Sequence, residues 1–67
     1  MTYEHNKLYF NGKTIILVIN RVFYIDGEEK PIIKNLSTGK NSVATDAYLL
    51  EKGYKEIEKI DSVHVKQ

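Results

Sequence analysis

The sequence predicts an α+β fold, with a small antiparallel sheet of three to four strands and one helix packed on one face. Three features predict it: β-branched and aromatic residues over 15–25, an Asn11-Gly12 pair between apolar runs, and helix-capping signals over 42–53. β-Branched and aromatic side chains suit a pleated, packed surface, and Asn-Gly favours a tight hairpin turn. The 67 residues suffice for one domain, residues 1–67.

The run over residues 15–25 reads I-I-L-V-I-N-R-V-F-Y-I and is the predicted central strand. Successive strand residues point to opposite faces, so the run has two faces. The first face carries Ile15, Leu17, Ile19, Arg21, Phe23 and Ile25. The second carries Ile16, Val18, Asn20, Val22 and Tyr24. Because both faces are mostly apolar, the strand is expected to be covered on both sides.

A two-residue loop at Asn11-Gly12 would pair Phe10 with Lys13 and Leu8 with Ile15. This register adds the apolar residues of the first strand to the first face. That face is then the richer one, and we assign it to the internal core, under the helix. The second face is turned away from the helix and is expected to bind a partner. We predict its interface residues to be Ile16, Val18, Val22 and Tyr24, and the edge strand around Pro31 is the alternative surface for self-association.

The middle of the chain predicts a turn, a strand and a loop. Residues 26–29 are expected to form a charged turn, followed by a shorter strand over 30–36 and a polar loop over 37–41. Pro31 cannot donate a backbone hydrogen bond, so it is expected at a strand start or on a sheet edge.

One helix is predicted over residues 42–52, with Ser42 or alternatively Thr45 as its N-cap and Gly53 in the left-handed position that ends it. Because Gly53 has ended this helix, the tail over 55–67 is interpreted as a strand bent near residues 61–62, although a three-residue apolar spacing also fits a helix. The apolar stripe that should face the sheet consists of Val43, Ala47, Leu50 and Tyr54, flanked by Ala44 and Tyr48.

Composition favours a homodimer. A domain this small usually needs a disulfide, a metal or a second subunit, and the absence of cysteine removes disulfides and thiolate metal sites. Asn20 and Arg21, polar within the apolar run, either set the register of the dimer contact or lie beyond the cover of the first strand. The N-terminus lacks the apolar segment of a signal peptide, and the run over 15–25 is far shorter than the ~20 residues that span a bilayer. We expect a cytoplasmic protein without a membrane partner.

No catalytic, cofactor or metal site is predicted. The segment T-G-K-N-S over 38–42 resembles a phosphate-binding loop but lacks its first glycine and the hydroxyl after the lysine. His5 and His64 supply at most half of a tetrahedral zinc site. The net charge is only +1, and the positive residues are interspersed with negative ones instead of forming a basic stripe. This pattern argues against nucleic-acid binding. The five tyrosines, with nearby lysines, are interpreted as core and interface residues, although they could also stack on bases.

The hairpin-first order and the stretch S-V-A-T-D-A-Y-L-L-E-K-G-Y leading into K-E-I-E-K-I resemble the Yopt-type family of small uncharacterised prophage proteins from Bacillus-like bacteria. The resemblance covers nearly the whole chain. It implies a homodimer whose subunit has one helix and about three strands, and it implies no known activity. We therefore expect a non-enzymatic homodimeric accessory protein of phage or prophage type that acts by protein–protein interaction, with a host protein as a possible partner. The alternative is a nucleic-acid-binding accessory protein that uses exposed tyrosines and lysines.

Overall fold

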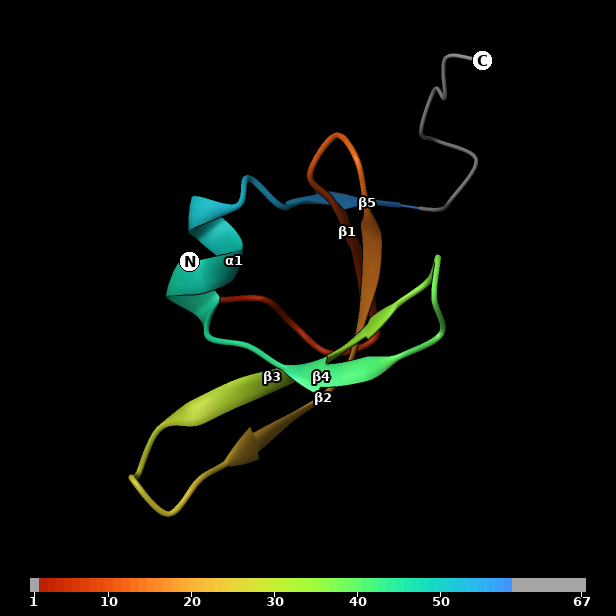
Figure 1. Cartoon of the computed structure of the whole chain (residues 1–67). Coiled ribbons are helices and arrows are strands. Elements are labelled where there is room, and N and C mark those ends of the chain that lie inside the picture. The colour runs from red at the N-terminus through yellow and green to blue at the C-terminus, as the bar shows by residue number, and fades with distance from the viewer. Residues whose placement is uncertain (1, 59–67) are drawn as a thin grey trace.

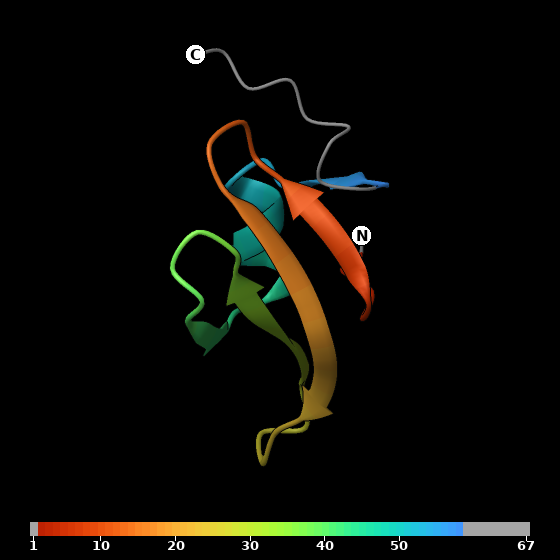
Figure 2. The same cartoon turned by 90° about the vertical axis from the view of Figure 1, so that its right-hand side faces the viewer.

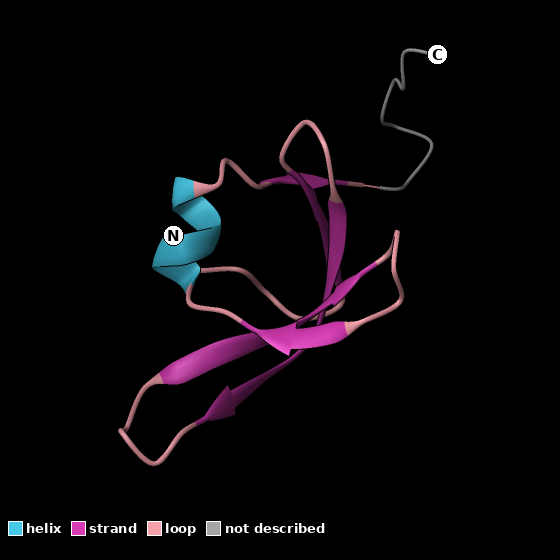
Figure 3. Cartoon of the chain, viewed as in Figure 1, coloured by secondary structure: helices cyan, strands magenta, loops and turns pink. Residues whose placement is uncertain are grey.

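The computed structural model describes residues 2–58 and contains an antiparallel five-stranded sheet and one short helix (Figures 1 and 3). The strand order in the sheet is β4-β3-β2-β1-β5. The arrangement is α+β, with one strand more than the predicted three to four allow. Residues 41–43, predicted as the end of a loop and the start of the helix, form the additional strand. The elements in chain order are β1 (Lys7–Phe10), β2 (Ile15–Phe23), β3 (Glu29–Asn35), β4 (Asn41–Val43), α1 (Asp46–Glu51) and β5 (Lys55–Ile57).

The β1–β2 hairpin is confirmed, with a register two residues away from the prediction. Phe10 pairs with Ile15, so the loop contains four residues instead of two. The Oδ1 atom of Asn11 accepts hydrogen bonds from the backbone N–H groups of Lys13 at 2.9 Å and Thr14 at 2.7 Å. Gly12 follows with a φ of +94°, a backbone conformation that suits glycine. Because the shift is an even number of residues, no side chain changes face.

The predicted face assignment is wrong. The sheet curls around α1 and the N-terminal segment (Figure 1), and the side chains that point into this space come from the second face. Ile16 is 1% exposed and Val18 is 0% exposed, so neither is a surface residue. The buried hydrophobic core consists of Tyr3, Tyr9, Ile16, Val18, Ile33 and Leu49.

Two tyrosines explain why this face is buried. Tyr3 and Tyr9 pack edge to face with ring centroids 4.7 Å apart, and each brings far more apolar area than an aliphatic side chain. Their hydroxyl groups find partners at the edge of the core. The Tyr3 hydroxyl donates to the carbonyl of Tyr54 at 2.7 Å, and the Tyr9 hydroxyl accepts from the backbone N–H of Glu4 at 2.9 Å. Tyr3 and Tyr9 therefore belong to the core, on the side of the sheet where a partner was expected.

A β-bulge divides the long strand into two halves. The pairing of β2 with β3 shifts between Val18 and Asn20, which leaves Ile19 as an extra residue. An extra residue reverses the inward and outward alternation beyond it. Arg21 therefore points to the same side as Val18, and Val22 points to the opposite side (Figure 2 shows the length and curvature of β2). The four predicted interface residues consequently lie on two different faces.

Pro31 is buried in β3, which lies between two other strands. It occupies the third position of this strand, and the β3–β4 ladder begins only at Ile32, opposite Val43. The Pro31 carbonyl accepts a hydrogen bond from the Ala44 N–H at 3.2 Å, just past the end of β4. At Pro31, β3 therefore has no ladder partner on the side of β4. This partly matches the expected position at a strand start or sheet edge.

The helix is shorter than predicted because residues 41–43 join the sheet as β4. Thr45 is the N-cap, and its Oγ1 atom accepts a hydrogen bond from the Tyr48 N–H at 3.0 Å. Within the helix the predicted apolar stripe is wrong: Leu49 is the buried residue of α1, whereas Tyr48 and Leu50 are about half exposed. Tyr54 and the flanking Ala44 do pack against the core, as predicted. The stripe relied on Val43 and Tyr54, which lie outside the helix.

The first part of the tail forms a strand, as preferred. Residues 55–57 form β5, which pairs with β1 so that Ile57 lies opposite Leu8. The expected bend near residues 61–62 falls outside the described residues.

Candidate functional site

One side of the sheet points away from α1, and we call its ladder positions the outward face. Leu17, in the middle of β2, lies between Leu8 of β1 and Lys34 of β3, and Leu8 in turn lies beside Ile57 of β5. Each of these three apolar side chains is partly exposed. The apolar residues of the outward face are Leu8, Phe10, Ile15, Leu17, Val22, Ile32, Val43 and Ile57.

Part of the outward face is contiguous: Ile57, Leu8 and Leu17 form a row across three strands, and the pair Phe10 and Ile15 lies beside it. Lys34 lies opposite Leu17 and Asn20 opposite Ile32, so no direct ladder pair joins the remaining apolar residues to this row. Neighbouring side chains on one face of paired strands lie about 5 Å apart, so they touch across the ladder. Single exposed apolar residues are common, whereas a contiguous patch marks an interaction site. Among the described residues, no helix or loop covers this side of the sheet, because α1 and the N-terminal segment both lie on the other side (Figure 1).

The charges on the outward face are of one sign. At outward ladder positions of the five described strands, the charged residues are Lys30, Lys34 and Lys55. The strand carboxylates Glu29 and Glu56 lie at inward positions, at the margins of the core. There they pair with Arg21 and Lys7 at 3.0 and 3.1 Å. Lys30 is partly neutralised by Asp26 at 3.2 Å.

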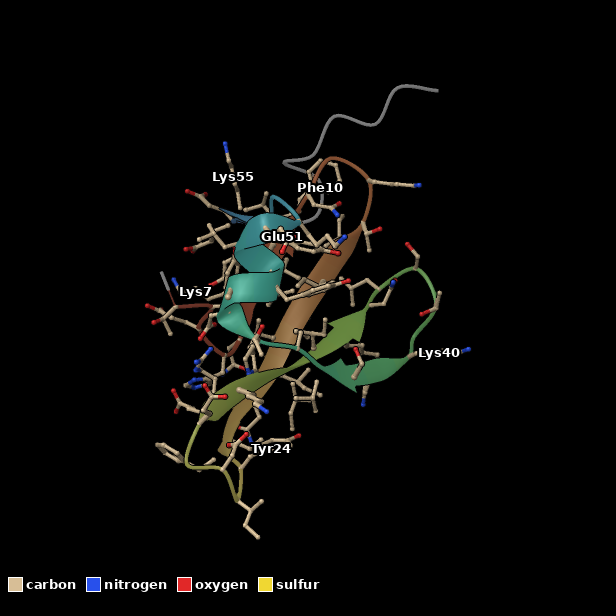
Figure 4. The ribbon with its side chains drawn as sticks, turned by 60° about the vertical axis from the view of Figure 1, so that its left-hand side comes forward. Lys7, Phe10, Tyr24, Lys40, Glu51 and Lys55 are labelled. Atoms are coloured by element: carbon tan, nitrogen blue, oxygen red, sulfur yellow. The ribbon has the colours of Figure 1, made fainter. Side chains whose placement is uncertain are left out.

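The β2–β3 hairpin ends in three consecutive apolar residues, Phe23, Tyr24 and Ile25, which we call the hairpin tip. Phe23 is 77% exposed, Tyr24 is 37% exposed and Ile25 is fully exposed. Figure 4 shows Tyr24 at the end of this hairpin, away from α1. The Lys30 ammonium lies 4.9 Å from the centroid of the Tyr24 ring, which places the ring on the outward side. Of the predicted interface residues, Val22 and Tyr24 thus adjoin the outward face.

Arg21 does not face a partner, contrary to one of the two predicted roles. Its guanidinium donates to both carboxylate oxygens of Asp46, at 2.9 and 2.7 Å, and to the carbonyl of Tyr3 at 2.6 Å. Asp46 also accepts a hydrogen bond from the Tyr3 N–H at 3.0 Å. The hydrogen bonds from Arg21, and secondarily the one from Tyr3, hold the pKa of Asp46 below its ordinary value, against the opposing effect of burial. This cluster ties the N-terminal segment, β2 and α1 together.

Residues 2–58 contain no group of three or more histidine, cysteine, aspartate or glutamate residues that could hold a metal ion. Of the two histidines weighed as zinc ligands, His5 lies in an exposed turn and His64 lies outside the described residues. Within the described part of the chain, no helix is long and apolar enough to cross a membrane. The outward face and the hairpin tip are therefore the surface that we consider for function.

Comparison with known proteins leaves the chain without an assigned relative. No protein-family model, no curated protein and no solved structure matches it. The likeness to the Yopt-type family stays an expectation from the sequence.

Proposed function

We propose that this protein is a small, non-enzymatic interaction module that binds a second copy of itself through the outward face. As a homodimer it would act as an accessory protein of phage type on a host protein. One observation carries this proposal: the apolar row of Leu8, Leu17 and Ile57 crosses three adjacent strands and is partly exposed. Apolar burial contributes roughly 25 cal/mol per Å² removed from water, so covering such a row favours association.

The size of the surface indicates which residues would take part. A stable protein interface buries roughly 800 Å² on each partner. That area corresponds to about one sixth of the 4979 Å² surface of this chain. The apolar row alone is a small part of that area. We therefore propose that Val22 and Tyr24, which lie on the outward side near the end of the β2–β3 hairpin, extend the contact.

Leu17→Asp tests this dimer. An aspartate in the centre of the apolar row would lose its hydration on association, so the dissociation constant should rise at least tenfold (about 1.4 kcal/mol). Sedimentation equilibrium of the wild type and the variant measures the change, and far-UV circular dichroism checks that the variant is folded. Ser37→Asp, in the exposed loop between β3 and β4, adds the same charge away from the face and should dimerise as the wild type does. A monomeric wild type at all concentrations, or a variant that dimerises equally well, would contradict the proposal.

A second function, nucleic-acid binding, is favoured by one observation: the charged residues at outward ladder positions are all lysines, and Tyr24 lies beside one of them. Phosphate contacts weaken steeply with added salt, whereas an apolar dimer contact does not. Fluorescence anisotropy with a labelled single-stranded oligonucleotide at two salt concentrations separates the two functions. If nucleic acid binds here, Lys34→Gln should weaken binding and reduce its salt dependence, and Lys52→Gln, beyond the C-terminal end of α1, should not. Binding that is unaffected by salt or by Lys34→Gln would exclude this second function.

A further inference from the structure

A cavity of about 480 Å³ lies between α1 and the strands β3 and β4, on the side of the sheet opposite the outward face. Its floor is apolar and is formed by Ile16, Ile33 and Leu49, all of which belong to the buried core. Small-molecule sites in proteins typically occupy 300–1,000 Å³ and combine an apolar lining with a few polar groups. The volume of this cavity lies within that range, and its floor is apolar.

The polar groups at the cavity are amide and hydroxyl groups. They belong to Asn35, Ser42, Tyr48 and Tyr54, together with the N-cap residue Thr45. The Asn35 Oδ1 atom accepts hydrogen bonds from the backbone N–H groups of Ser37 at 2.8 Å and Thr38 at 3.2 Å. These bonds fix the carboxamide and leave its nitrogen as a donor. The rim can therefore both donate to and accept from a neutral polar group.

No charged residue lines the cavity, since all ten lining residues are uncharged. Burial, and secondarily the nearby Tyr48, raises the pKa of the Tyr54 hydroxyl, so this group keeps its proton at neutral pH. An ion in the cavity would find no countercharge among the lining residues, which disfavours its binding relative to that of a neutral molecule. The chemistry of the lining thus selects against both anions and cations.

We propose that this cavity is a binding site for a small neutral molecule with an apolar ring and one or two hydrogen-bonding groups. The ring would lie against Ile16, Ile33 and Leu49, and the polar group would reach the amide or hydroxyl groups of the rim. The floor of this site is separate from the proposed dimer surface, because Ile16, Ile33 and Leu49 point inward. At its rim on the edge strand β4, the cavity shares Val43 with the outward face. Binding here does not depend on whether the chain dimerises.

Three probes of one size and different charge test the proposal: benzyl alcohol, benzoate and benzylammonium. Each is titrated at pH 7 into the ¹⁵N-labelled wild-type chain, and amide chemical shifts are followed. Benzyl alcohol should shift the amide resonances of Ala44 and Leu49, and its dissociation constant should be at least tenfold lower than that of either ion. Equal affinity for the three probes, no binding of benzyl alcohol, or shifts confined to the outward face would each overturn the proposal.

Variants that fill the cavity provide the second test. Ala44 lines the cavity, so Ala44→Leu should raise the dissociation constant for benzyl alcohol at least tenfold. Ser42→Leu fills the cavity from an exposed position of β4 and should likewise raise the dissociation constant for benzyl alcohol at least tenfold. This variant tests the site if Ala44→Leu does not fold. Ala47→Leu, on the exposed side of α1 and not at the cavity, is the matched control and should bind as the wild type does. A folded cavity variant that binds benzyl alcohol as tightly as the wild type would overturn the site.

Discussion

Val18→Asp is expected to prevent the chain from folding, whereas Leu17→Asp leaves it folded. The two residues are adjacent in β2 and receive the same new side chain, but Val18 is 0% exposed and Leu17 lies partly exposed on the outward face. The buried aspartate would lie beside Ile33 in the core, and the two cations on that side of the sheet are already paired, Lys7 with Glu56 and Arg21 with Asp46. Burying an unpaired charge costs several kcal/mol. That cost is of the same order as the whole stability of a small domain, roughly 5 kcal/mol.

Far-UV circular dichroism and urea unfolding of the two variants measure the difference. We expect no cooperative transition for Val18→Asp and a transition close to that of the monomeric wild type for Leu17→Asp. Val18→Ala is a useful companion, because it removes only part of the buried side chain and should lower the free energy of unfolding by roughly 1–3 kcal/mol. A folded Val18→Asp variant together with an unfolded Leu17→Asp variant would show that the core lies on the other face.

Asp46→Asn should have the second largest effect, through the cluster of Arg21, Asp46 and Tyr3. The side chains of Arg21 and Asp46 are 11% and 25% exposed, so the pair is largely shielded from water. Removing the carboxylate charge weakens two hydrogen bonds from Arg21 and one from the Tyr3 N–H. Loss of one partner of a buried pair costs about 3–5 kcal/mol. Because this pair is only partly buried and Arg21 keeps Glu29, we expect about 2 kcal/mol at pH 7.

The effect should depend on pH in a defined direction. Arg21 holds the pKa of Asp46 below its ordinary value of 3.8. A carboxyl group whose pKa is lower in the folded state stabilises the fold at pH values above its unfolded pKa. This stabilisation is lost as the pH falls through the folded pKa, since both states are then protonated. The free-energy difference between the wild type and Asp46→Asn should therefore stay constant from neutral pH down to about 5 and shrink below about 4.

Urea unfolding of both proteins between pH 7 and pH 2.5 measures this difference. Glu56→Gln is the matched control, because Glu56 pairs with Lys7 at 3.1 Å, but both side chains are more than 40% exposed. Exposed ion pairs contribute about 0–1 kcal/mol, so this variant should change little. A larger effect for Glu56→Gln than for Asp46→Asn would contradict the structural role of the Arg21 cluster.

Local features of this fold could be predicted from the sequence. Asn11-Gly12 marked the first hairpin, and the charged turn over 26–29 marked the second, because turn chemistry depends on neighbouring residues alone. Thr45 was one of two candidate N-caps, and Gly53 ends the helix with a φ of +81°. The hairpin register was wrong by two residues because the Asn11 side chain bonds the backbone of the loop and lengthens it.

The side of the sheet that is buried could not be predicted from alternation. Both faces of β2 are apolar, and which of them is buried depends on Tyr3. Tyr3 lies in a segment without regular secondary structure, 13 residues before Ile16 in the chain. The bulge at Ile19 was also missed. Asn20 was the available signal, because its Oδ1 atom accepts a hydrogen bond from the Arg21 N–H at 2.8 Å, and such local bonds compete with a regular ladder.

Of the four predicted interface residues, burial excludes two as surface residues, and the other two stay a prediction. Val22 and Tyr24 keep their predicted role as an expectation, since they adjoin the outward face beyond the bulge. Ile16 and Val18 lose it, because they are buried in the core. Leu17, Leu8 and Ile57 take their place in the proposal.

The absence of cysteine allows one direct measurement of this claim, because a single introduced thiol can be labelled without background. The rate of reaction with a thiol reagent is followed for Leu17→Cys and Val18→Cys over a range of protein concentrations. We expect the Leu17→Cys thiol to react fast in dilute solution and to become protected as the concentration rises, while the Val18→Cys thiol is protected throughout. A Leu17→Cys thiol that reacts equally fast at every concentration, or a Val18→Cys thiol that reacts faster, would contradict an outward face that binds a second copy.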